Sequence, residues 1–208
     1  MFIKSIPHWI QKLMKRYTWQ MPEDLEKPTV YLTFDDGPHA SITPWVLDQL
    51  NAFEAKATFF CIGKNVVENP AVYDRILKEG HSVGNHTHNH IKGRVMGLEP
   101  YLDDVEKARE HIDSQLFRPP YGSLKLAQAK ALEQLGYKII LWSIIPGDWE
   151  AKISPENCLD NIISNIKPGS IIVLHDSEKA QRNIQFVLPL VLEFCKQKGW
   201  NCANLPGY

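Results

Sequence analysis

Cysteine is scarce in this 208-residue sequence, and the few cysteines are scattered along it. No two of them stand in a Cys-x-x-Cys pair, so the sequence has neither the ligand spacing of a structural zinc knuckle nor the pattern of a disulfide framework. Cys195 and Cys202 would be able to pair in an oxidising compartment. Free or buried thiols are nevertheless the expected state of all four, Cys61, Cys158, Cys195 and Cys202.

Long apolar runs and a large net charge of either sign are also missing. No segment approaches the roughly 20 apolar residues that a membrane-spanning helix needs. The formal net charge is −1, and aromatic residues are not interleaved with basic clusters, so we expect no nucleic-acid partner. Internal repeats, low-complexity segments and linkers are absent as well. With 44% hydrophobic and 23% charged residues, the composition is that of one globular domain.

The N-terminal extension, residues 1–27, does not have the pattern of a secretory signal. It contains no continuous apolar region and no small-residue cleavage site. Its apolar side chains recur at steps of three and four residues with basic residues among them, which predicts an amphipathic helix. This helix either packs on the domain or contacts a membrane surface or a partner through residues 1–20. We expect a cytoplasmic protein, with a membrane-associated or cell-envelope location as the alternative.

From residue 29 onward, short apolar segments rich in β-branched residues alternate with segments of helical periodicity. The expected strands are 30–34, 58–62, 139–143 and 170–175, with 81–85 and 116–118 as two shorter candidates. The expected helices are 43–53, 66–78, 98–114, 124–135, 155–166 and 181–198. This alternation predicts an α/β domain with a parallel sheet, open or closed, and helices outside it. Functional side chains in such folds gather at the carboxyl ends of the strands.

Histidines are concentrated in residues 81–90, which hold four of the eight in the chain. A single histidine is usually a surface or core residue, but such a cluster favours metal binding. His86 and His90 are four residues apart, so on one helical turn they would face the same way and would be able to bind one ion. We expect His81 and His88 to be structural or solvated.

Adjacent carboxylates, Asp35 and Asp36, stand where the first strand ends in a Gly-Pro turn. Taken alone they are typical turn residues. Two histidines, one carboxylate and a water, however, are the ligand set of an open, catalytic divalent-metal site. The other carboxylate then remains available to accept a proton from the water. The combination predicts metal-assisted hydrolysis.

Three later segments carry further candidates. Arg118 precedes two prolines, and a guanidinium on a stiff loop can pair with the unligated carboxylate. The backbone N–H of Tyr121 in that loop can donate to a developing oxyanion. His175, at the end of the last strand, suits a general acid for a leaving amine, with Asp148 as its partner. Trp149 suits stacking on a sugar face or the wall of an acyl pocket.

In this order, the segments resemble the motifs of the polysaccharide deacetylase family (NodB-homology domain, carbohydrate esterase family 4). The similarity extends from about residue 30 to residue 175. It implies a distorted (β/α) barrel of about seven parallel strands, with residues 28–208 as one catalytic domain. It also implies a hydrolase that uses a divalent metal, zinc in most members, with Co²⁺ or Ni²⁺ as alternatives. The implied substrate is an acetylated amino-sugar glycan, such as chitin oligomers or peptidoglycan, which loses N-acetyl or O-acetyl groups.

The resemblance also implies roles for individual residues. The metal ligands are Asp36, His86 and His90. The catalytic residues are Asp35 as base, His175 as acid, Arg118, Asp148 and Tyr121. The substrate contacts are Tyr121, Trp149 and Leu174.

The sequence departs from the family pattern at Ile145, where an acidic residue is common, and this puts the local loop and its substrate contacts in doubt. It also lacks the carbohydrate-binding module of many polymer-acting members. An amidase acting on a small non-sugar C–N bond, or an enzyme acting on a lipid-linked sugar, is therefore kept as an alternative. A non-catalytic glycan- or membrane-binding protein is a third hypothesis, against which the intact Asp35 and His175 argue.

Overall fold

The apolar segment at the start of the expected sheet is strand β1 (Thr29–Asp35) of the computed structural model, which describes residues 16–206. β1 lies between β2 (Thr58–Cys61) and β6 (Ile171–His175) and runs parallel to both. The other strands are β3 (Ser82–Asn85), β4 (Leu116–Phe117), β5 (Lys138–Ile139) and β7 (Asn201–Cys202). Their order is β5-β4-β3-β2-β1-β6, with β7 also paired to β1. All the pairings between these strands are parallel, as expected.

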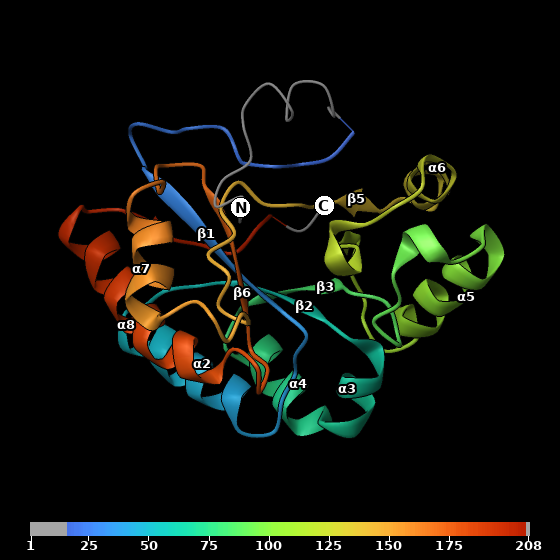
Figure 1. The fold of residues 1–208 in the computed structure, drawn as a ribbon, viewed down its shortest axis with the longest axis horizontal. Coiled ribbons are helices and arrows are strands. Elements are labelled where there is room, and N and C mark those ends of the chain that lie inside the picture. The colour runs from blue at the N-terminus through green and yellow to red at the C-terminus, as the bar shows by residue number, and fades with distance from the viewer. Residues whose placement is uncertain (1–15, 207–208) are drawn as a thin grey trace.

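Helices cover the outer side of this sheet, from α7 and α8 at one end to α5 and α6 at the other (Figure 1). They are α2 (Ile42–Ala52), α3 (Gly63–Glu68), α4 (Pro70–Lys78), α5 (Leu98–Arg109), α6 (Leu126–Gln134), α7 (Pro155–Ile163) and α8 (Gln181–Gln197). Two short 3₁₀ turns are η1 (Gly93–Val95) and η2 (Pro120–Gly122). In the part of the chain that the structure describes, no helix is both long and apolar enough to cross a membrane.

Two predicted elements differ from those observed. The single helix expected over 66–78 is two helices, α3 and α4, which meet at Asn69. Pro70 begins α4 because proline has no N–H to continue the hydrogen bonding of α3, whereas the first turn of a helix needs none. The strand expected over 139–143 is limited to β5, and the chain after it makes only isolated bridges.

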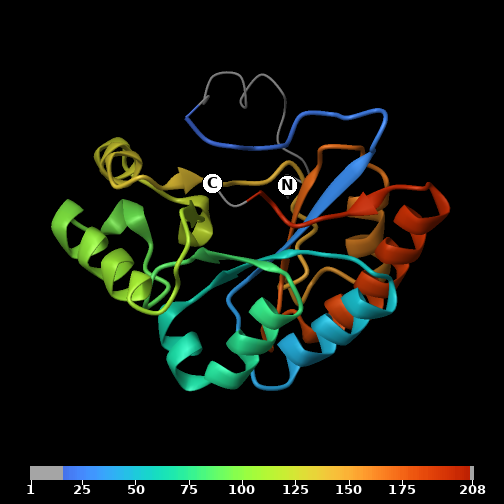
Figure 2. The ribbon, with the colours of Figure 1, turned by 180° about the vertical axis from the view of Figure 1, so that it is seen from behind.

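The sheet curls into a distorted half-barrel, which confirms the expected fold class. Beyond β5 the chain reaches toward β6, where Ile144 forms a parallel bridge with Ile172. The end of the N-terminal extension contributes to the same region, since Thr18 bridges Ile140 and Gln20 bridges Ser170. Figure 2 shows β7 beside the start of β1, at the end of the sheet away from the carboxyl end of β1.

Most of the predicted amphipathic helix falls on residues 1–15, which lie outside the described residues. The rest of the N-terminal extension, residues 16–27, runs as turns, isolated bridges and irregular backbone. The hydrogen bonds of Thr18 with the backbone of Ile139 and Leu141 attach this stretch to the domain.

The alternation of side chains along β1 separates the core from the site. Val30, Leu32 and Phe34 are fully buried in the main hydrophobic core, which the helices cover. Thr33 and Asp35 point to the other side, where the Arg118 guanidinium contacts both. Because successive residues of a strand face opposite ways, one segment supplies both the core and the first catalytic candidate.

Candidate active site

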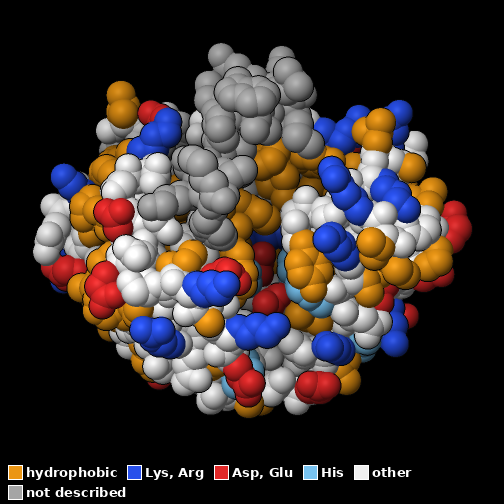
Figure 3. Space-filling model, in the orientation of Figure 1, with side chains coloured by type: hydrophobic (Ala, Val, Ile, Leu, Met, Phe, Trp, Pro, Cys, Tyr) orange, Lys and Arg blue, Asp and Glu red, His pale blue; other side chains and the backbone are white. Residues whose placement is uncertain are grey.

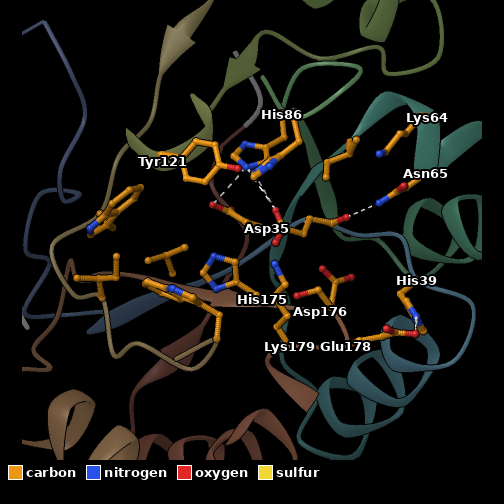
Figure 4. Close-up of a pocket in the computed structure, with 18 residues that line it drawn as sticks. Asp35, His39, Lys64, Asn65, His86, Tyr121, His175, Asp176, Glu178 and Lys179 are labelled. Carbon is orange, nitrogen blue, oxygen red and sulfur yellow. Dashed lines mark hydrogen bonds and ion pairs between the residues drawn. The ribbon is translucent and has the colours of Figure 1, made fainter. Parts of the chain in front are cut away.

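A cavity of about 800 Å³ opens at the carboxyl ends of the strands. Its lining includes the ends of β1 and β6, the loop after β3 and the loops that follow β4 and β5. In Figure 3 the opening shows acidic side chains in its floor, with lysine and arginine side chains around its rim. Figure 4 shows Asp35, His86 and His175 converging there. This is the position that parallel α/β folds use for their active sites.

Three of the lining residues form a candidate metal site, as the sequence predicts. Asp36, His86 and His90 each offer one ligand atom, and these atoms lie within 4.8 Å of one another. Asp36 Oδ1 is 3.8 Å from His86 Nε2 and 3.2 Å from His90 Nε2. The same Oδ1 is buried and accepts no hydrogen bond from the described residues. A buried, unsatisfied carboxylate oxygen between two imidazoles fits a divalent cation.

The two histidines do not share a helical turn, contrary to the sequence prediction. The chain after β3 is irregular, and Thr87 and His90 have positive φ angles of 64° and 56°. These left-handed residues turn the backbone so that the rings of His86 and His90 meet with centroids 5.1 Å apart. Asp36, with a φ angle of 80°, is a third residue with left-handed backbone conformation. Backbone strain of this kind is typical of functional sites.

His86 is oriented for ligation through its Nε2 atom. Its Nδ1 lies 2.7 Å from the Arg118 carbonyl oxygen, so Nδ1–H donates there and Nε2 keeps its lone pair toward the site. Burial lowers the pKa of His86 to about 4, although the nearby Asp35 charge opposes the shift. Burial raises the pKa of Asp36. Contact with His90 and the charges of His175 and His86 lower this pKa by more than burial raises it, so the net shift is downward.

Asp35 lies next to the metal group, where a base is expected. Arg118 Nη1 is 2.7 Å from Asp35 Oδ1, and the guanidinium side chain is completely buried. Arg118 also donates to the Thr33 hydroxyl and to two backbone carbonyls, which fixes its plane. Asp35 Oδ2 remains 3.9 Å from His86 Nε2 and faces the cavity side of the pair. One carboxylate oxygen is thus held by Arg118, and the other faces the position of the ion.

His175 and Asp148 form the predicted second pair. His175 Nδ1 is 3.0 Å from Asp148 Oδ1, and the His175 backbone N–H donates to Oδ2 at 2.7 Å. Asp148 is 1% exposed. Burial lowers the pKa of His175, but the charge and hydrogen bond of Asp148 raise it more, to about 9. His175 is therefore an imidazolium at neutral pH, suited to give up a proton.

Of the three predicted substrate contacts, two line the cavity and one does not. Tyr121 and Trp149 line the cavity, with the Tyr121 ring 4.8 Å from that of His90 and the Trp149 ring 4.7 Å from that of His175. Leu174 does not line it, because its side chain is fully buried in the main core. Val173 faces the cavity instead, since strand residues alternate and His175 already points inward. Trp142 is also a lining residue.

Asp176 is a buried residue of the site that the sequence analysis did not select. Its buried carboxylate accepts the Gly37 N–H at 3.0 Å with Oδ1 and the Thr43 hydroxyl with Oδ2. Burial raises the pKa of Asp176 to about 7, against the hydrogen bond from Thr43. Asp176 thereby holds the loop that carries Asp36. Its position at the carboxyl end of a strand next to His175 was the only available signal.

The other histidines of the cluster are structural, as expected. His81 is buried, accepts the Ala57 N–H at 3.2 Å and packs edge-on against Phe59. His88 is 8% exposed and stands outside the group of metal-ligand candidates.

Comparison with known proteins agrees with this geometry. The sequence profile of the polysaccharide deacetylase family matches residues 23–140. The chain is 35% identical over 195 residues to a peptidoglycan-N-acetylglucosamine deacetylase of Bacillus cereus, covering 90% of each chain. It is 39% identical over 155 residues to a chitooligosaccharide deacetylase of Azorhizobium caulinodans, covering 71% of this chain and 73% of that one.

Among solved structures, the fold resembles that of a peptidoglycan N-acetylglucosamine deacetylase crystallised with 4-naphthalen-1-yl-N-oxidanyl-benzamide. The TM-score is 0.86 at 30% identity, covering 97% of this chain and 95% of that one. A pseudoenzyme of carbohydrate esterase family 4 from Bacillus anthracis has the same fold, with a TM-score of 0.78 at 23% identity, covering 90% of this chain and 66% of that one. Activity therefore has to be argued from the residues of the site.

Proposed function

The chain belongs to the polysaccharide deacetylase family, and from that premise we propose that it hydrolyses the N-acetyl groups of N-acetylglucosamine residues in a glycan. The names of its relatives point to peptidoglycan or chitooligosaccharides as the substrate. One observation carries the proposal. Asp36, His86 and His90 share one cavity with a carboxylate, Asp35, and an imidazole, His175, whose pKa is raised to about 9. This is the set of ligands, base and acid that amide hydrolysis requires.

Zinc is the ion that we assign to the group, because two imidazole nitrogens and one carboxylate oxygen are a ligand set of catalytic zinc. When bound by Asp36, His86 and His90, zinc would supply Lewis-acid polarisation of the acetyl carbonyl and a lowered pKa for a water molecule. The neutral state of His86 and the ionised state of Asp36, toward which their pKa shifts tend, are the protonation states that ligation needs.

The residues around the ion have complementary roles in this proposal. Asp35 accepts a proton from the attacking water at Oδ2, while Arg118 holds Oδ1 and keeps the carboxylate in position. The Tyr121 N–H donates to the oxyanion of the tetrahedral intermediate. His175 then donates its proton to the departing nitrogen, and Asp148 stabilises the imidazolium beforehand. The products are acetate and a free amine.

Cavity size favours a glycan over the alternative of a small amide. A volume of about 800 Å³ is far larger than a simple amide fills, and it lies within the range of sites for larger ligands. Tyr121, Trp142 and Trp149 add aromatic surface on which sugar rings can stack. The buried Asp35–Arg118 and His175–Asp148 pairs argue against a purely binding role, because a binding protein needs neither a base nor an acid at the ion.

The test is release of acetate from the N-acetylglucosamine tetramer by protein stripped of metal with a chelator. We expect no release by the stripped protein and recovery on adding stoichiometric Zn²⁺. Asp35→Asn should bind zinc and remain inactive. Release that does not depend on metal would reject the assigned site, and zinc binding without release from either the tetramer or a peptidoglycan fragment would reject the substrate class.

A further inference from the structure

Two lysines at the cavity, Lys64 and Lys179, have no place in the mechanism above. Both are exposed and both line the cavity. Neither forms an ion pair with any residue from 16 to 206. Glu178, the acidic residue next to Lys179 in the sequence, lies with its Oε1 atom 3.7 Å from His39 Nε2. Of the acidic residues in the floor, Asp35 is paired with Arg118, Asp36 belongs to the metal-ligand group, and Asp176 accepts hydrogen bonds from Gly37 and Thr43. At the rim a ligand meets the two lysines and one exposed carboxylate, that of Glu178, so positive charge is in excess there.

Lys64 is held in place by the loops that carry the metal ligands. It is the second residue of α3, and its backbone N–H donates to the His88 carbonyl at 3.2 Å. On one side of it, the Gly63 N–H donates to the Thr87 carbonyl at 3.0 Å. On the other, Asn65 Nδ2 donates to the Asp36 carbonyl at 2.7 Å. The start of α3 is thus fastened to both ligand-bearing segments.

The contact of α3 with these loops is too close for a different residue at position 63. A Cβ atom added to Gly63 would lie 2.7 Å from His88 Nδ1 and 2.9 Å from Ala108 Cα. Glycine allows the approach because it has no side chain. Lys64 therefore projects from a backbone whose position relative to the candidate metal ligands is fixed.

Lys179 is positioned by the chain that follows the proposed acid. The Asp176 N–H donates to the Asp35 carbonyl at 3.2 Å, and the Ala180 N–H donates to the Ser177 carbonyl at 3.0 Å, which closes a turn. Ala180 is fully buried, so this turn is anchored at its end. In Figure 4 the side chains of Lys64 and Asn65 lie on one side of Asp35 and that of Tyr121 on the other.

The cavity therefore has two unlike walls. One carries Tyr121, Trp142, Ile145 and Trp149 and is largely apolar. The other carries Lys64 and Lys179 together with one acidic residue, Glu178, and polar residues, among them His39, Asn65 and Ser177. A sugar with its apolar face on the aromatic wall presents its substituents to the lysines. A neutral chito-oligosaccharide has nothing to pair with them. A peptidoglycan strand does, through the carboxylates of its stem peptides or, on a peptide-free muramic acid residue, through the lactyl carboxylate.

We propose that Lys64 and Lys179 bind carboxylate groups of the substrate and make this site selective for carboxylate-bearing, peptidoglycan-type glycans over neutral N-acetylglucosamine oligomers. The inference rests on the proposed deacetylase function and adds the substrate class to it. The lysines act on binding, so their contribution belongs in KM more than in kcat.

The experiment compares kcat/KM on three probes, using the zinc-loaded protein. They are a tetrasaccharide peptidoglycan fragment with its carboxylates free, the same fragment with its carboxylates methyl-esterified, and the N-acetylglucosamine tetramer. The variant is Lys64→Gln/Lys179→Gln. The control is Lys78→Gln/Lys130→Gln, which changes net charge equally at exposed residues of α4 and α6 that do not line the cavity.

We expect the wild-type protein to prefer the free fragment to both neutral probes. In the Lys64/Lys179 variant, the ratio of kcat/KM on the free fragment to that on the esterified fragment should fall by about 3- to 30-fold, as two exposed ion pairs allow. Raising salt should reduce the wild-type preference, because about 1 M ionic strength shortens the Debye length from roughly 10 to 3 Å. The control should keep the wild-type ratio.

Three outcomes would overturn the inference. They are a wild-type ratio near one, a ratio that survives loss of both lysines, and, with UDP-N-acetylglucosamine as a fourth probe, a kcat/KM on this diphosphate higher than that on the free fragment. In each case, continued hydrolysis of the tetramer would leave the deacetylase function standing. Loss of activity on every probe by zinc-loaded wild-type protein would instead remove the proposed function itself.

Discussion

The Arg118 guanidinium lies 2.7 Å from Asp35 Oδ1, and its side chain is completely shielded from solvent. Further hydrogen bonds to the Thr33 hydroxyl and to the carbonyls of Ile140 and Leu141 use three of its four other N–H donors. The Arg118 guanidinium carbon also lies 4.0 Å from the centre of the Phe60 ring. The pair is therefore rigid, and it leaves only one oxygen of Asp35 available for proton transfer.

Replacing Arg118 should damage both activity and stability. Arg118→Met removes the charge while keeping much of the volume, so Asp35 is left buried without a partner. We expect the free energy of unfolding to fall by about 3–5 kcal/mol and kcat to fall at least about 100-fold. Urea unfolding and acetate release measure the two effects.

A second variant separates charge from packing. Arg118→Met/Asp35→Asn removes both charges, so it should recover much of the lost stability but none of the activity. If the double variant is as unstable as Arg118→Met alone, lost packing rather than the unpaired carboxylate explains the effect.

The pH profile of kcat should have an alkaline limb set by His175. Its pKa of about 9 means that the acid is protonated at neutral pH and loses its proton as pH rises through that value. Asp148→Asn removes the negative charge that raises the pKa of His175. The alkaline limb should therefore move to lower pH by about 1–2 units, with a lower kcat. Asp160→Asn, on the exposed side of α7, is the matched control. An unmoved limb in Asp148→Asn would show that another group sets it.

The pair of His175 and Asp148 should also make the free energy of unfolding depend on pH. The folded-state pKa of His175 lies above the value of about 6.5 expected in the unfolded chain. Its contribution is therefore fully present below about pH 6.5 and is lost as pH rises through 9. The loss is at most roughly 3 kcal/mol. Urea unfolding of wild type and His175→Gln at pH 6 and pH 10 should show the difference only at the lower pH.

Zinc should stabilise the folded protein. At a free concentration of 100 times its Kd, a ligand that binds only the native state adds about 2.7 kcal/mol to the free energy of unfolding. Thermal scans of chelated protein should therefore show a rise in Tm on adding zinc. Asp36→Ala, His86→Ala and His90→Ala should each lose that rise. His88→Gln should keep it, because His88 is in the same cluster but outside the ligand group. A rise in Tm in all three ligand variants would place the ion elsewhere.

Asp176 should act on metal affinity through the loop after β1. Asp176→Asn can still accept the Gly37 N–H, and its amide can hydrogen-bond the Thr43 hydroxyl, so we expect nearly normal zinc binding. Asp176→Ala loses both contacts and should weaken zinc binding by about 10- to 100-fold. Competition with a chromogenic chelator measures the affinities. Equal affinities in the two variants would mean that Asp176 does not position Asp36.

Local sequence was sufficient for the chemistry of the site. Asp35, Asp36 and His175 stand at strand ends that apolar, β-branched runs make recognisable, and parallel strands bring their carboxyl ends together. His86 and His90 were recognisable from their spacing and residue type, since few patterns other than a metal site place so many histidines together. The exclusion of Leu174 from the cavity was also within reach, because alternation along β6 places it opposite His175.

Only the tertiary structure decided how these residues meet. The left-handed backbone at Thr87 and His90 depends on neighbouring loops, and an assumed helical turn was wrong because periodicity cannot detect single residues with positive φ. Asp176 and the lysines at positions 64 and 179 acquire their places through hydrogen bonds between segments distant in the chain. Sequence alone thus determines which groups are present and at which strand ends, while packing of the strands and loops determines their distances, burial and pKa shifts.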